Sequence, residues 1–321
     1  MNDLSCLLSQ YQLRSPFIIE LNNVDEEKVY NYFDNKNVGA IILPSVTEEI
    51  LIKEKKVVES ISQLHFNTIN NNSHIIPQYL SLIKEIKSKI DIPIIARIDI
   101  YSAENCLLFC ELLEKAGVDI IDLNIFFFPD DKEFRSYDYE KIFFEIAAKV
   151  TYSTGIPVFI RHPLNFTHII NSVDQLFYRG VQGFILFPCP PVIDIDINNL
   201  EFSKGTSFNL DFLNQYSLNW LAVLSCHIPR ADYIQYIHSP ITPESIIKSL
   251  LIGSKGFIIN ENNIAILELC INMIYEWMNM HGFSKIEHFQ GQINYDDTKA
   301  IIQELREIQI KPRLVTKNEM K

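Results

Sequence analysis

The feature that most constrains this chain is a short apolar run that recurs eight times and ends each time at a polar or turn residue. The clearest example runs from Val118 to Asn124, directly after a helix-like segment that ends at Ala116-Gly117. Continuous apolar runs are typical of strands that are buried on both faces, and such strands belong to parallel sheets. Helix-like segments separate the runs, so the pattern indicates a series of strand–helix units.

We predict the eight strands at residues 16–20, 39–43, 94–99, 118–124, 157–161, 183–187, 221–225 and 256–260. Eight strand–helix units in one chain predict an α/β fold of the closed (β/α)8 type, the TIM barrel. An open doubly wound sheet is the alternative. No stretch marks a boundary, so residues 1–321 are predicted to form a single barrel domain.

The spacing of the strands leaves room for additions to the basic barrel. Insertions are predicted at 47–74, after the second strand, and at 188–219, after the sixth. A helix is predicted at 24–35. Helical segments at 264–281 and 296–310 predict a C-terminal helical extension beyond the eighth strand.

Composition excludes some classes of function. The chain is 47% hydrophobic and 21% charged, with a formal net charge of -12 and no basic stripe. This balance argues against nucleic acid and against an anionic membrane surface as partners. Its six cysteines are scattered without a C-x-x-C pair, and no apolar run approaches the roughly 20 residues of a membrane span. The first residues have no signal-peptide pattern, so we expect a reduced, cytoplasmic protein.

If the barrel forms, the side chains at the C-terminal ends of its strands should meet at one mouth, where barrel enzymes keep their chemistry. These residues are Glu20, Pro44, Ser45, Asp99, Asn124, Arg161, His162, Pro188, Cys189, Ser225, Cys226, His227, Asn260 and Glu261. The set contains no lysine, which argues against Schiff-base chemistry. The loops after the predicted seventh and eighth strands contain no glycine, which argues against a standard phosphate cradle.

A metal or acid–base site remains open as an alternative at this mouth. Asp99, His162 and His227 are the residues from which it would be built. No H-x-H or similar close ligand pair supports a metal, so we predict none.

Several segments also carry a resemblance to a known family. They are Val38 to Ser45 with Glu48-Glu49-Ile50, 92–99, Ala116 to Phe126, 194–197, 220–225 and 277–291. In order and spacing, over almost the whole chain, they resemble the dihydroorotate dehydrogenase-like barrels, FMN-dependent relatives of the class 1 dihydroorotate dehydrogenases. The resemblance implies a (β/α)8 barrel with FMN at its mouth. It implies candidate cofactor contacts, at the strand ends, from Ser45, Asp99, Asn124, Arg161, Ser225 and Asn260.

The same comparison shows what this chain has lost. In the family a lysine ends the second strand, and here the residue is Pro44. The family's serine or cysteine base lies three residues after the strand-four asparagine, where this chain has Phe127 or Phe128, and a phenyl ring accepts no proton. The strand-five lysine corresponds to Arg161. The glycine of the strand-seven phosphate loop corresponds to Cys226.

Two further family features are replaced as well. The glycine- and serine-rich loop after strand one is Glu20-Leu21-Asn22-Asn23, and the Gly/Ser-Thr pair after strand eight is Asn260-Glu261. Each charge-assisted or backbone bond to a phosphate contributes roughly 1.5–3 kcal/mol, so losing several weakens binding by decades.

We therefore expect a divergent barrel with an eroded FMN and catalytic site, no confident catalytic residue, and a role as a non-catalytic binding or assembly module. The alternative is an FMN-dependent oxidoreductase with an altered substrate. A protein partner or a homodimer is expected. The apolar run Phe126-Phe127-Phe128 is either a plug for the barrel mouth or an exposed patch for such a partner.

Overall fold

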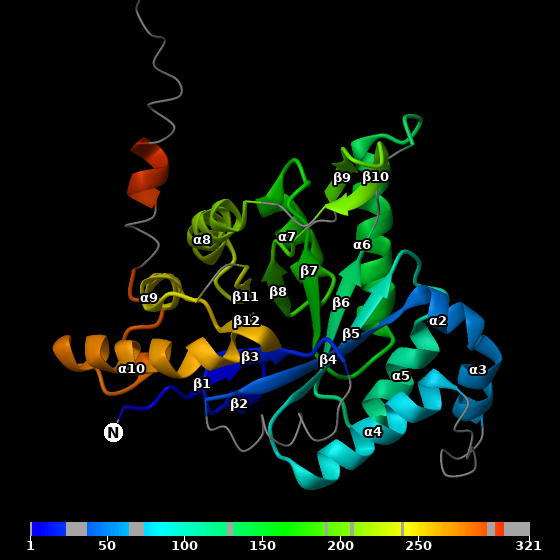
Figure 1. The fold of residues 1–321 in the computed structure, drawn as a ribbon, viewed down its shortest axis with the longest axis horizontal. Helices are drawn as coiled ribbons and strands as arrows, with labels where there is room; N and C mark the ends of the chain where they lie inside the picture. The colour runs from blue at the N-terminus through cyan, green and yellow to red at the C-terminus, as the bar shows by residue number, and fades with distance from the viewer. Residues whose placement is uncertain are drawn as a thin grey trace, which may run out of the picture.

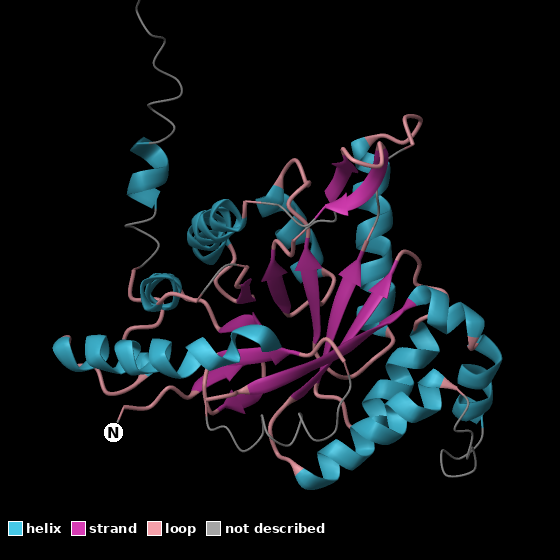
Figure 2. Ribbon diagram, in the orientation of Figure 1, coloured by secondary structure: helices cyan, strands magenta, loops and turns pink. Residues whose placement is uncertain are grey.

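The computed structural model describes residues 2–23, 37–63, 74–126, 131–189, 192–205, 209–238, 241–293 and 299–304. Eight parallel strands close into a barrel in the order β11-β12-β3-β4-β5-β6-β7-β8 (Figure 1). Helices lie around the outside of this barrel (Figure 2). The fold is therefore the predicted (β/α)8 barrel.

The strands have the following bounds. The barrel strands are β3 (Phe17–Glu20), β4 (Ala40–Thr47), β5 (Ile94–Ile100), β6 (Ile120–Ile125), β7 (Val158–His162), β8 (Gly183–Leu186), β11 (Asp232–Tyr236) and β12 (Gly256–Asn260). Two antiparallel hairpins lie outside the barrel sheet, formed by β1 (Cys6–Leu8) with β2 (Tyr11–Leu13) and by β9 (Val192–Asp196) with β10 (Glu201–Gly205).

The described helices connect these strands. They are α2 (Glu48–Lys53), α3 (Lys55–Gln63), α4 (Ile75–Lys89), α5 (Leu107–Ala116), α6 (Ser136–Tyr152), α7 (Ile169–Tyr178), α8 (Leu210–His227), α9 (Pro243–Ile252) and α10 (Ile264–Met280). Short 3-10 turns follow at η2 (Glu261–Asn263) and η3 (Ile286–His288).

The barrel interior is apolar and is closed at the N-terminal end of its strands. One cluster combines inward residues of the barrel strands, such as Ile18, Ile95 and Phe159, with Leu8 and Leu13 of the first hairpin. The hairpin therefore packs its buried side chains into the open end of the barrel. A larger cluster fills the space between the outer faces of the strands and the helices, as the apolar character of both strand faces predicts.

The hairpin is also joined to the last strands of the barrel by polar contacts. The backbone N–H of Ser9 donates to Asp232 Oδ2 at 2.5 Å, and Cys6 Sγ lies 3.6 Å from the carbonyl oxygen of Lys255. Access to the interior is thus left to the C-terminal end of the strands.

The seventh strand was predicted in the wrong place. Residues 221–225 belong to helix α8, and the strand is β11, Asp232–Tyr236. The apolar run of 221–225 was mistaken for a strand, but Leu213, Ser217, Leu221 and Leu224 share one buried face at helical spacing. The other seven predicted strands are confirmed.

The insertions lie after the second and sixth strands, as predicted. The first contains α2 and α3 and continues into residues outside the described chain. The second was expected to be irregular, but it contains the β9–β10 hairpin and the first half of α8. In the C-terminal extension, α10 and a helical segment at 299–304 are present. The predicted helix at 24–35 and the remainder of 296–310 lie outside the described residues.

Candidate functional site

A layer of polar side chains lies directly above the apolar interior, toward the C-terminal mouth of the barrel. Side chains alternate along a strand, so residues two positions beyond an inward apolar residue also point inward. Glu20 follows Ile18 in this way, and the same spacing places four more polar side chains in the layer. They are Arg97, Asp122, Arg161 and Tyr236.

Arg161 is the centre of this layer and is buried. Its Nε donates to both carboxylate oxygens of Asp122, at 3.0 and 2.9 Å, and its Nη2 donates to Asp122 Oδ2 at 2.6 Å. Nη2 also donates to Glu20 Oε1 at 2.5 Å. Burial alone would lower the pKa of Arg161, but the two carboxylates raise it above its ordinary value. The guanidinium is therefore a fixed cation that is already bound by protein carboxylates.

Glu20 joins the two arginines and a tyrosine. Its Oε1 also accepts from Arg97 Nη1 at 3.0 Å, and its Oε2 accepts from the Tyr236 hydroxyl at 2.5 Å. Burial alone would raise the pKa of Glu20, but Arg161, Arg97 and the tyrosine hydrogen bond leave it below its ordinary value. Burial, together with the charge of Glu20, raises the pKa of Tyr236, so the phenol stays protonated and donates.

The outer edge of the network lies at the ends of β5 and β6. Arg97 Nε donates to Asp99 Oδ1 at 2.8 Å, and its Nη2 donates to Asp99 Oδ2 at 3.1 Å. Asn124 Nδ2 donates to Asp99 Oδ1 at 3.0 Å. Of the residues that the sequence placed at these strand ends, Asp99 is thus held by Arg97 and by Asn124.

The balance of charge in the layer is negative. Two guanidinium groups face the three carboxylates of Glu20, Asp99 and Asp122. Burial raises the pKa of Asp122, and the Arg161 charge opposes that rise. An anion entering the barrel would therefore compete for the two guanidinium groups with carboxylates that already bind them. The anion would also lose its own hydration, which is costly for a buried charge.

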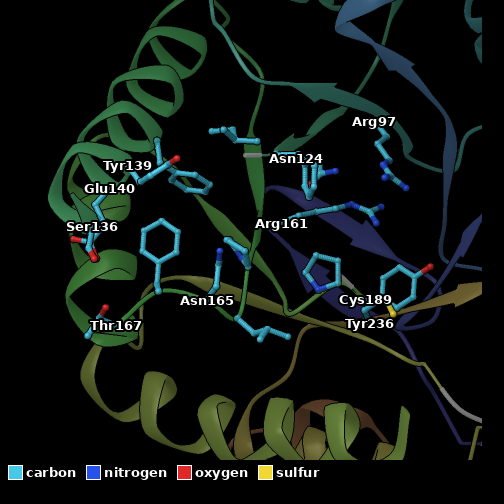
Figure 3. Close-up of a pocket in the computed structure, with 17 residues that line it drawn as sticks. Arg97, Asn124, Ser136, Tyr139, Glu140, Arg161, Asn165, Thr167, Cys189 and Tyr236 are labelled. Atoms are coloured by element: carbon cyan, nitrogen blue, oxygen red, sulfur yellow. The ribbon is translucent and has the colours of Figure 1, made fainter. Parts of the chain in front are cut away.

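A cavity of about 720 Å³ opens beside this network. Arg97, Asn124, Arg161 and Tyr236 line one end, and the first turns of α6 line the other (Figure 3). This volume lies within the range of small-molecule sites, roughly 300–1,000 Å³. The cavity is therefore large enough for a ligand with one or two rings.

The walls of the cavity are mostly apolar and aromatic. Phe143 of α6 and Phe166 of the loop after β7 meet edge to face, with ring centroids 5.0 Å apart. Leu164 and the half-exposed Phe126 add to this wall, and Cys189 lies at the rim near Tyr236 (Figure 3). The site combines one polar end with an aromatic slot, which suits a flat ring that carries a few polar atoms.

The structure places the predicted site residues at different distances from the cavity. Asn124 and Arg161 line the cavity, as do Pro188 and Cys189, and Asp99 and Glu20 support it through the network. Pro44 and Ser45 lie at a bulge in β4, and they are not among the described residues that line the cavity.

Asn260 is tied to other residues at the mouth. Its Oδ1 accepts from Asn262 N at 3.0 Å, and its Nδ2 donates to Asn22 Oδ1 at 3.2 Å. Glu261 Oε1 in turn accepts from Asn22 Nδ2 at 3.0 Å. These bonds close the end of β12 against the loop after β3.

Ser225, Cys226 and His227 were predicted at the mouth and are misplaced. They belong to the last turn of α8, where Ser225 Oγ and His227 Nδ1 contact backbone oxygens of the same helix. A helix in this fold runs back against the strand direction, so its last turn lies at the opposite end of the barrel. The loop that follows the true seventh strand begins at Ile237.

His162 points away from the mouth, so the acid–base alternative built on it is wrong. The next residue after Arg161 faces outward, and His162 packs against Phe166 and against α7. His162 Nε2 and Ser172 Oγ are hydrogen-bonded, and Ser172 Oγ also contacts the Ile169 carbonyl oxygen. Burial lowers the pKa of His162 to about 4. It is a neutral core histidine.

Sequence reasoning missed Arg97, Asp122 and Tyr236. It considered only the last residue of each strand, whereas these side chains lie one inward position deeper. Counting back by two from Asp99 gives Arg97, and counting back by two from Asn124 gives Asp122. A charged residue within an apolar strand was the available signal. Phe127 and Phe128 lie outside the described residues.

The described residues at the mouth do not fit an FMN phosphate. The resemblance places the phosphate beside the loops after strands seven and eight. At β12 those positions present the Asn260 and Glu261 side chains, and Asn260 already accepts the N–H of Asn262. After β11, His238 Nε2 donates to the Phe187 carbonyl at 2.8 Å, and its ring stacks on Tyr236. A phosphate dianion is best bound by free N–H donors and cations. Here it would meet the Glu261 carboxylate and donors that are already used in hydrogen bonds.

Within the described ranges, no group of three or more His, Cys, Asp or Glu side chains is arranged to hold a metal ion. In the same part of the chain, no helix combines the length and the apolar character needed to cross a membrane. A scan against protein-family models finds no matching family, and a search of curated proteins finds no significant match.

Proposed function

We propose that this protein is a divergent dihydroorotate dehydrogenase-like barrel that acts as a non-catalytic binding module. Its ligand is an uncharged, planar ring compound that enters the cavity at the barrel mouth. The observation that carries the proposal is the state of Arg161. Its guanidinium, at the position of the cation that a flavin barrel directs at its cofactor, is bound by Asp122 and Glu20.

The chemistry of the ligand follows from the two ends of the cavity. The aromatic end, with Phe143 and Phe166, favours a flat ring through stacking and edge contacts. The polar end carries formally one more carboxylate than guanidinium, so a neutral amide or imide is favoured there over a carboxylate. An amide both donates and accepts, and it can pair with Asn124 and Tyr236 without displacing an ion pair.

Benzamide and benzoate form a matched pair for the test, because they share a ring and nearly the same shape and differ in charge. Calorimetric titration should show benzamide binding about tenfold or more tightly than benzoate, a difference of roughly 1.4 kcal/mol. The variant Leu164→Trp, which fills the cavity from its wall, should lose benzamide binding and keep the wild-type circular dichroism spectrum. Tighter binding of benzoate, or binding unaffected by this variant, would contradict the proposal.

The alternative is an FMN-dependent oxidoreductase with an altered substrate. Cavity size and the presence of Asn124 and Arg161 on its wall favour this candidate. The absorbance spectrum of the purified protein separates the two. We expect no flavin band and no change in tryptophan fluorescence on addition of FMN. A flavin band near full occupancy would reject the non-catalytic proposal and leave the oxidoreductase.

A further inference from the structure

The β9–β10 hairpin has two chemically different faces. The strands pair antiparallel, with Phe202 opposite Ile195 and Ser203 opposite Asp194. Since side chains alternate between the faces of a strand, Ile193, Ile195 and Phe202 share one face, on which the register also places Lys204, opposite Ile193. Asp194, Ser203, Asp196 and Glu201 share the other. Near its turn the hairpin therefore has one apolar face and one acidic face.

The apolar face is open to solvent. Phe202 is 81% exposed, and Ile193 and Ile195 are also exposed. The turn continues this surface with Ile197 and with Leu200, which is 86% exposed. Large neighbouring apolar side chains on the surface of a folded protein mark an interaction site. The hairpin stands beyond the ends of the barrel strands in the view of Figure 1.

The hairpin also has unfilled strand edges within the described chain. There β9 pairs with β10 alone, and β10 with β9 alone. A two-stranded hairpin is marginally stable in water, and a third strand is the usual way to stabilise one. The N–H of Ile195 donates to Asp194 Oδ1, at 2.8 Å, so it faces away from β10. An edge of this kind is a template for another strand.

The acidic face specifies the charge of the incoming strand. Asp196 is used within the hairpin, where it accepts from Asn198 N and Asn199 N and so closes the turn. Asp194 shares its face with the exposed Glu201, and one of its carboxylate oxygens, Oδ1, accepts the Ile195 N–H. A second copy that paired through β9 would place acid beside acid, because β9 carries Asp194 and Asp196 and no basic residue, and like charges in adjacent strands are destabilising. Basic residues beside these acids in an added strand would be favourable.

We propose that the β9–β10 hairpin is a docking site for an extended segment of a partner protein in which apolar residues alternate with lysine or arginine. The segment adds a third strand to the hairpin. Its apolar side chains extend the face of Ile195 and Phe202, and its basic side chains lie beside Asp194 or Glu201. This docking site is separate from the cavity at the barrel mouth, and neither proposal depends on the other.

The test uses two labelled ten-residue peptides and the full chain. In one peptide valine alternates with lysine, and in the other the same residues are in two blocks. Both have the same net charge, so general attraction to this acidic protein is equal for both. Fluorescence anisotropy at low micromolar concentration should show the alternating peptide binding about tenfold or more tightly. Equal binding of the two peptides would overturn the proposal.

Two variants of exposed hairpin residues locate the site. Phe202→Ser should weaken the alternating peptide about tenfold and leave the melting temperature of the barrel unchanged. Glu201→Lys should weaken the same peptide and should improve binding of a peptide in which glutamate replaces each lysine. Unchanged affinities in both variants would overturn the proposal. Sedimentation that shows a dimer in the wild type and a monomer in Phe202→Ser would also overturn it, because a second copy would then cover the face.

Discussion

Replacing Arg161 with methionine tests whether the barrel mouth is a structural ion-pair layer. The substitution removes four N–H···O contacts, three to Asp122 and one to Glu20. Methionine fills much of the same space with an unbranched, flexible side chain. It leaves Asp122 fully buried beside no cation that contacts it directly. Removing one partner of a buried ion pair costs about 3–5 kcal/mol, and we expect Arg161→Met to lose that much free energy of unfolding at pH 7.

The loss should depend on pH in a defined direction. Burial already raises the pKa of Asp122, and removal of Arg161 raises it further. Because the folded-state pKa then lies above the unfolded value of about 3.9, the penalty is complete at neutral pH and shrinks as pH falls toward that value. The gap between variant and wild type should therefore be smaller at pH 4.5 than at pH 7.

Urea unfolding, followed by the fluorescence of Trp220 and Trp277, measures these differences. Arg230→Met is the matched control, because Arg230 is exposed and its replacement should change stability by less than about 0.5 kcal/mol. The double variant Arg161→Met with Asp122→Leu removes the pair together, and it should recover most of the loss. A single variant within about 1 kcal/mol of wild type, or a double variant less stable than the single, would refute the reasoning.

Three further predictions concern other parts of the fold. Burial lowers the pKa of His162 from 6.5 to about 4, so as pH falls the unfolded chain protonates this histidine before the folded chain does. The free energy of unfolding should therefore drop by roughly 3 kcal/mol between pH 6.5 and pH 4, and His162→Gln should reduce that drop in thermal melts. In Gly39→Ala the added Cβ would lie 1.9 Å from the Ser15 carbonyl oxygen, so the strand must shift; we expect a loss of about 1–3 kcal/mol in urea unfolding, and an unchanged midpoint would contradict this close approach. Cys189 is the exposed thiol and Cys226 is half-buried, so a thiol reagent should label Cys189 first; Cys189→Ser should remove the fast phase, and a fast phase that persists would place the reactive thiol elsewhere.

The barrel could be predicted from the sequence because its strands are buried on both faces. A run such as Ile94 to Ile98 carries little polar interruption, and such runs stand out between helical segments. The seventh strand was missed because its sequence is less apolar. Asp232, Gln235 and Tyr236 make it look polar, since Gln235 pairs with Ser249 of α9 and Tyr236 belongs to the charged layer. The more apolar run nearby was chosen instead.

The site was predictable only in part, because hydrogen bonding across the barrel depends on register. Asp99, Asn124 and Arg161 could be placed at one mouth from the strand order alone. The hydrogen bonds of Arg161 to Asp122 and Glu20 could not be predicted in the same way. Predicting them requires knowing which inward-facing residues lie at the same height along the barrel axis. Neighbouring strands are staggered in a closed barrel, so the level of a residue does not follow from its position within its own run.

The charged layer also has a consequence for how the chain folds. Its members are far apart in sequence: the Arg161–Glu20 bond joins residues 141 positions apart, and the Tyr236–Glu20 bond joins residues 216 apart. Contacts across such distances form after local strand–helix units, because the entropy of closing the long loop must first be overcome. Until those contacts form, the arginine and carboxylate side chains of the layer stay hydrated. Substitutions in this layer should therefore accelerate unfolding and leave the early folding rate nearly unchanged.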